Sequence, residues 1–77
     1  MANVIINFKN GNRAFLRSHT NSRYEDGRLM ACHKPVIAKR RHLAATLSLS
    51  DAEDWVNDAH NKKEWLNHNN IFYCEVL

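Results

Sequence analysis

The side chains best suited to chemistry in this sequence are five histidines and two cysteines. A metal site built from one short segment uses a CxxC pair or two histidines four residues apart on a helix. Here Cys32 and His33 are neighbours, but neither spacing occurs. Further candidate ligands are scattered along the chain: His42, His60, His68 and Cys74. The sequence therefore predicts no metal site, and it contains no motif that predicts a cofactor.

Catalysis by a nucleophile would require a cysteine or serine beside a histidine and an orienting acid. Cys74 alternates with Phe72 and Val76, so we expect its thiol to point into the core as a small apolar group, and we expect the same of Cys32. The acids in residues 51–58 fit the start and the solvated face of a helix. There is no glycine-rich phosphate loop. We therefore expect the protein not to be an enzyme.

Positive charge is concentrated in the first part of the chain. Residues 1–45 contain nine basic and two acidic side chains, a net charge of +7, whereas residues 46–77 contain two lysines and six acids, a net charge of −4. Segregated charge is informative about partners rather than about the fold. We expect the basic part to attract phosphate backbones or an acidic protein surface.

The N-terminal segment "VIINFKNGNRAFLR" predicts a β-hairpin that turns at Asn10-Gly11. A two-residue loop would pair Ile6 with Phe15, whereas a three-residue loop that begins at Lys9 would pair Ile6 with Ala14. The second register is favoured because it buries more apolar surface on one face. That face would contain Val4, Ile6, Phe8, Ala14 and Leu16.

The middle of the chain gives weaker signals. Residues 18–27 are polar and predict a loop that ends in an Asp26-Gly27 turn. Residues 28–33 predict a strand, which Pro35 interrupts or moves to a sheet edge. Residues 36–49 allow either a helix that starts at Pro35 or a strand. The regular alternation of leucines near the end of this segment favours a strand that leads into a helix cap.

Residues 50–61 predict the main helix. Ser50 and Glu53 have the spacing of a capping box, in which each side chain binds a free amide of the first turn. An apolar stripe follows at helical spacing and consists of Ala52, Trp55, Val56 and Ala59. Asn61 is the expected C-terminal cap, residues 62–66 predict a further turn, and residues 67–70 predict a loop.

The last segment, residues 71–77, predicts a strand. Its alternation would place Phe72, Cys74 and Val76 on one face, and Ile71, Tyr73 and Glu75 on the other. The whole chain, residues 1–77, then forms a single α+β domain, with a small antiparallel sheet and one main helix packed on one face. The opposite face of the sheet is left to solvent or to a partner.

That uncovered face is the predicted binding surface, because Arg13, Phe15 and Arg17 should point outward from it. The basic run that begins at Lys39 would by itself serve as a solvated face or protect a strand edge from aggregation. Combined with the hairpin residues, it predicts a basic, partly aromatic surface. The candidate partner-binding residues are Arg13, Phe15, Arg17, Lys34, Lys39, Arg40 and Arg41. Such residues suit single-stranded nucleic acid, and arginine and aromatic side chains also dominate protein interfaces.

The layout resembles small phage-encoded host-takeover proteins, which include anti-CRISPR proteins and inhibitors of host polymerases or nucleases. The segments that carry the resemblance are "VIINFKNGNRAFLR", "SLSDAEDWVNDAH" and "IFYCEVL". It covers most of the chain, but it is a similarity of plan without a shared motif, so it assigns no functional residue. Many members of that group are acidic mimics of nucleic acid, whereas this chain is basic.

The resemblance implies a non-enzymatic inhibitor that binds a protein component of nucleic-acid-handling machinery. Direct binding of single-stranded DNA or RNA by the same surface is the alternative. No apolar run approaches the roughly 20 residues of a membrane span, and no signal-peptide pattern is visible. We therefore expect a cytoplasmic protein with reduced thiols and no membrane partner. The sequence leaves open the identity of the partner and the oligomeric state.

Overall fold

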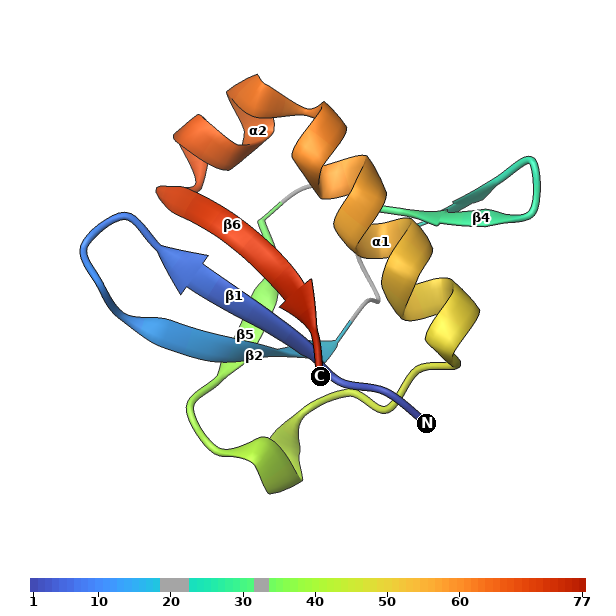
Figure 1. The fold of residues 1–77 in the computed structure, drawn as a ribbon, viewed down its shortest axis with the longest axis horizontal. Coiled ribbons are helices and arrows are strands. Elements are labelled where there is room, and N and C mark those ends of the chain that lie inside the picture. The colour runs from blue at the N-terminus through green and yellow to red at the C-terminus, as the bar shows by residue number, and fades with distance from the viewer. Residues whose placement is uncertain (19–22, 32–33) are drawn as a thin grey trace.

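The computed structural model describes residues 1–18, 23–31 and 34–77 (Figure 1). A four-stranded antiparallel sheet has the strand order β5-β2-β1-β6. Its strands are β1 (Val4–Phe8), β2 (Arg13–Ser18), β5 (Val36–Ala38) and β6 (Ile71–Val76). The other elements are the ribbon of β3 (Arg23–Glu25) and β4 (Arg28–Met30), the 3-10 turn η1 (Arg41–Leu43), and the helices α1 (Leu49–Asn61) and α2 (Lys63–His68). Because α1 packs against β6 and β4, the predicted α+β class is confirmed.

The β1–β2 hairpin has the predicted register, with Ile6 opposite Ala14. Its three-residue loop is closed by the Phe8 amide, which donates to the Asn12 carbonyl at 2.8 Å. Gly11 has a φ of 90°, a conformation that a residue without a side chain adopts at little cost. Turn chemistry and apolar pattern therefore select the same pairing, which brings Ile6 into the core.

The core lies between one face of this sheet and α1. The predicted stripe of the helix is buried there, and Trp55 meets Trp65 of α2 edge to face, with ring centroids 5.7 Å apart. The predicted capping box was wrong, because the helix begins two residues earlier. Ser48 is the N-cap, and its Oγ accepts the Asp51 amide at 3.1 Å. The early start follows from Leu47, which is buried and forms a β-bridge with Ala2 just before the chain turns.

A β-bulge changes the predicted faces of the last strand. Asn7 lies opposite Tyr73, but its neighbour Phe8 lies opposite Ile71, so Phe72 is an extra residue in β6. Ile71 is therefore buried at 1% exposure, whereas Phe72 is 67% exposed. The prediction that Phe72 lies on the same side as Cys74 was wrong, because strict alternation fails at a bulge. Cys74 itself is buried, as predicted.

The predicted loop at residues 18–27 was also wrong in part. Ser18 still belongs to β2, and β3 pairs with β4 through a turn in which Asp26 and Gly27 both have positive φ. The Asp26-Gly27 turn was predicted correctly. The predicted strand at 28–33 is the shorter β4, which ends at Met30 and pairs with β3 in this separate ribbon. Its Leu29 is buried in the core, and β4 packs beside α1. The prediction for Cys32 lies outside the described residues.

The segment that was ambiguous in the sequence is only briefly a strand. Residues 36–38 form β5, an edge strand that follows Pro35 as expected, and η1 comes next. The predicted alternation fails because the amides of Leu43 and Ala44 bond back to Arg40 and Arg41, which winds the chain into a turn. Helix α1 ends at Asn61, with Lys62 as its C-cap, and α2 extends to His68 into the predicted loop.

Candidate functional site

The sheet face turned away from α1, called the outer face below, is built from two cross-strand rows. Across β2, β1 and β6, one row contains Arg13, Asn7 and Tyr73, and the other contains Phe15, Ile5 and Glu75. The predicted outward direction of Arg13 and Phe15 follows from this register. Arg13 is exposed, but Phe15 is half-buried rather than fully exposed. Ile5 is only 6% exposed, so its neighbours cover the middle of the face.

A hollow of about 390 Å³ opens on the outer face, and four of the predicted binding residues line it. These residues are Arg13, Phe15, Lys39 and Arg41. The turn η1 follows β5 and lies beside β2. This arrangement brings Lys39 and Arg41 close to the hairpin residues, although they are distant in the sequence. The hollow therefore combines three cationic side chains with an aromatic ring and the apolar side chains of Ile5 and Leu77.

Arg13 is held by an acidic neighbour on the same face. Its Nη2 lies 3.6 Å from Oε2 of Glu75, and the same oxygen accepts a hydrogen bond from Nδ2 of Asn7 at 2.8 Å. The Arg13 side chain is nevertheless 61% exposed, so its guanidinium is open to a ligand. Glu75 orients Arg13 and partly offsets its charge.

Arg41 is positioned by a buried asparagine, Asn3, just before β1. The Nε of Arg41 donates to Oδ1 of Asn3 at 3.1 Å, and Nδ2 of Asn3 donates to the Ala45 carbonyl at 3.0 Å. With both hydrogen bonds, Asn3 fixes η1 and the segment after it against β1. Sequence reasoning missed this residue, because a single asparagine next to a strand carries no periodic signal.

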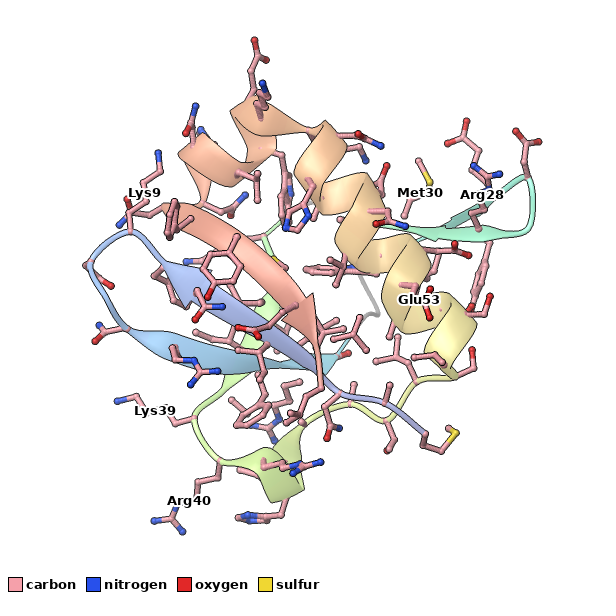
Figure 2. All side chains as sticks on the ribbon, viewed as in Figure 1. Lys9, Arg28, Met30, Lys39, Arg40 and Glu53 are labelled. Atoms are coloured by element: carbon pink, nitrogen blue, oxygen red, sulfur yellow. The ribbon has the colours of Figure 1, made fainter. Side chains whose placement is uncertain are left out.

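The remaining predicted residues are not all brought together. Arg17 is exposed at a register shift between β2 and β5, outside the lining of the hollow. Figure 2 shows Lys39 and Arg40 extending from the side of the molecule opposite Arg28. Lys34 belongs to a different hollow, which it lines with residues of α2 and of the turn after it. The structure therefore separates Lys34 from the other candidates.

Two aromatic rings at the β6 edge extend the site beyond the prediction. Phe72 and Tyr73 meet edge to face, with centroids 5.2 Å apart and an interplanar angle of 83°. Both are exposed, at 67% and 42%. The outward direction of Tyr73 followed from strand alternation. No pattern in the sequence predicted the bulge that exposes Phe72.

The buried cysteine is not activated for catalysis. Burial raises the pKa of the Cys74 thiol to about 12, so the thiol stays protonated near neutral pH. The backbone amide of Cys74 donates to Nε2 of His60 on α1 at 3.0 Å. Elsewhere, a hydrogen bond to the Asp51 carboxylate raises the pKa of Tyr24. Among the described residues, no three histidine, cysteine or acidic side chains are grouped as metal ligands.

Comparison with protein-family models, with curated proteins and with solved structures finds no match to this chain. In the part of the chain that the structure describes, no helix has the length and apolar character needed to span a membrane. The functional argument therefore depends on the outer face itself.

Proposed function

We propose that this protein is a non-enzymatic binding protein that inhibits nucleic-acid-handling machinery through its outer face. The observation that carries the proposal is the hollow that Arg13, Lys39 and Arg41 line together with Phe15. It lies on the sheet face that α1 leaves uncovered. A cationic rim with an apolar floor suits a partner that presents acidic groups beside apolar or aromatic surface.

Inhibition needs only occupation of a partner's working surface, which a domain of this size can achieve without chemistry of its own. Arginine and aromatic side chains give large binding energies when they are desolvated at the centre of an interface. Asn3 and Glu75 hold two of the arginines in place before binding. Such preorganisation lowers the entropic cost of association.

The proposal is tested by inhibition assays on a panel of purified enzymes: an RNA polymerase, a replicative DNA polymerase and RNA-guided nucleases. We expect the protein to slow at least one of these enzymes. The double variant Arg13→Glu, Lys39→Glu, which reverses two charges that line the hollow, should weaken inhibition by about tenfold or more, equivalent to about 1.4 kcal/mol.

The matched control is the double variant Arg28→Glu, Lys63→Glu, which reverses two exposed charges outside the hollow. It should inhibit like the unmodified protein. If no enzyme on the panel is slowed, or if both variants lose inhibition equally, the proposal is wrong.

Direct binding of single-stranded nucleic acid is the second candidate function. The observation that favours it is the exposed ring pair of Phe72 and Tyr73, on the same sheet as the basic hollow. Rings that accept bases and cations that accept phosphates are the two components such binding requires.

A further inference from the structure

We infer that Phe72 and Tyr73 form a stacking site for unpaired bases of single-stranded nucleic acid, whose phosphates contact Arg13. This assignment rests on the proposed function, since it takes the outer face as the contact surface and names what that face touches in the target machinery. It adds a base-binding part beside the basic hollow.

The β-bulge in β6 is the structural feature that exposes this ring pair. The bulge in β6 makes Phe72 the extra residue, while Ile71 and Cys74, which flank the ring pair, stay buried. Bulges commonly re-aim side chains next to functional sites. Here the bulge places a 67% exposed phenylalanine ring against Tyr73. Because both side chains stay exposed, ring surface is available for stacking with a base.

The distance between the rings and Arg13 suits one nucleotide. Tyr73 lies opposite Asn7, which lies opposite Arg13, so the three residues form one row across neighbouring strands. Strands are spaced by about 4.8 Å, which separates the backbones of Tyr73 and Arg13 by roughly 10 Å. A base on the rings would therefore bring its phosphate within reach of the Arg13 side chain.

The cations that line the hollow extend the proposed contact path beyond Arg13. Lys39 and Arg41 line the hollow with Arg13, so a strand that leaves the rings would next meet three cations. Glu75 is the opposing charge, and it is already engaged by Asn7 and Arg13.

Single-stranded nucleic acid fits this arrangement better than a duplex. A duplex presents its phosphates but hides the faces of its bases within the stack. It would therefore contact the arginines without stacking on Phe72 or Tyr73. The ring pair therefore points to unpaired nucleotides, as in an open transcription or cleavage complex.

The test measures fluorescence anisotropy of labelled thymidine oligomers about twelve nucleotides long, within the usual site size of single-strand binders. A matched abasic oligomer has the same phosphates and no bases. We expect tight binding only to the base-bearing oligomer. Phe72→Ala should weaken that binding roughly 5- to 150-fold, the effect of losing about 1–3 kcal/mol of stacking. The salt dependence should keep its slope, because no phosphate contact is lost.

Two further variants separate stacking from other effects. Phe72→Leu keeps an apolar side chain but removes the ring, and it should weaken binding nearly as much as Phe72→Ala. Leu49→Ala removes another exposed apolar side chain, on α1, and should change nothing. Circular dichroism of each variant checks the fold, which an exposed side chain should not affect.

Equal affinity for the abasic and base-bearing oligomers, or unchanged affinity in Phe72→Ala, would overturn the inference. So would the absence of binding to any oligomer, which would leave a protein surface as the partner. These outcomes are separate from failure of the proposed function. If the double variant of Arg13 and Lys39 abolishes enzyme inhibition while Phe72→Ala binds oligomers normally, the stacking site alone is wrong. If oligomer binding depends on bases but no enzyme is inhibited, the proposed inhibition alone is wrong.

Discussion

The carboxylate of Asp58 should be among the most important polar groups for stability, although it lies far from the outer face. Its Oδ2 accepts the Ala31 amide at 2.7 Å and lies 2.8 Å from Nζ of Lys62. Lys62 in turn donates to the Ala31 carbonyl at 2.7 Å. Ala31 is fully buried just after β4. These contacts attach the β3–β4 ribbon to α1.

The variant Asp58→Ala should lower the free energy of unfolding by about 2–4 kcal/mol. A hydrogen bond to a charged group contributes roughly 1.5–3 kcal/mol, and a buried amide left without a partner costs about 1–3 kcal/mol, terms that partly overlap. The Lys62 pair is partly exposed and adds at most about 1 kcal/mol. Since a domain of this size has a total free energy of unfolding of only about 5–15 kcal/mol, the change should be easy to measure.

Urea unfolding followed by tryptophan fluorescence measures this change, because Trp55 is buried in the core and becomes exposed on unfolding. Asp58→Asn keeps a hydrogen-bond acceptor without the charge. Its free energy of unfolding should lie between those of Asp58→Ala and the unmodified protein. The control Glu53→Ala removes an exposed carboxylate from the same helix and should stay within about 0.5 kcal/mol. If Asp58→Ala and Glu53→Ala unfold at the same urea concentration, the reasoning is wrong.

Four other outcomes follow from the same structure. Leu29→Ala should lower the unfolding free energy by about 2–5 kcal/mol, because it leaves a cavity in the core; a loss below about 1 kcal/mol would contradict its burial. Arg13→Ala combined with Arg17→Ala should leave the thermal midpoint within a few degrees, since both side chains are exposed, and a large drop in a thermal melt would place them in the core. Glu75→Gln should tighten binding of the base-bearing oligomer by about two- to fivefold in the anisotropy assay, because it removes the charge that offsets Arg13; weaker binding would mean that Glu75 mainly orients Arg13. Folding raises the Cys74 pKa from 9.0 to about 12, so the stability this protonated thiol contributes is complete below pH 9 and declines as pH rises towards 12. Comparison of Cys74→Ala with the unmodified protein in urea across this pH range should show the difference, and a constant difference would contradict it.

The sequence predicted the parts of the fold that depend on apolar periodicity. The hairpin register followed from the apolar alternation around Ile6 and Ala14, and the buried helix face followed from the spacing around Trp55. In both cases one arrangement buries clearly more apolar surface than its rivals. The outward direction of Arg13 came with the register, so part of the candidate site was predictable too.

The parts that were missed depend on contacts between distant segments. Ser48 and Ser50 are both reasonable caps, and the bridge of the neighbouring Leu47 to Ala2 decides between them. The exposure of Phe72 depends on a bulge against β1, which local alternation cannot reveal. The clustering of Lys39 and Arg41 at the hollow depends on how η1 lies beside β2.

The hydrogen bond from the Cys74 amide to His60 also limits how this sheet can grow. Strand β6 is an edge of the sheet, and edge strands offer free amides on which other chains can assemble. In the middle of β6, the imidazole of His60 already accepts a hydrogen bond from one of these amides, that of Cys74. An incoming strand would have to displace a side chain that is fixed to a helix, so the histidine acts as a stop against edge-to-edge polymerisation on this side.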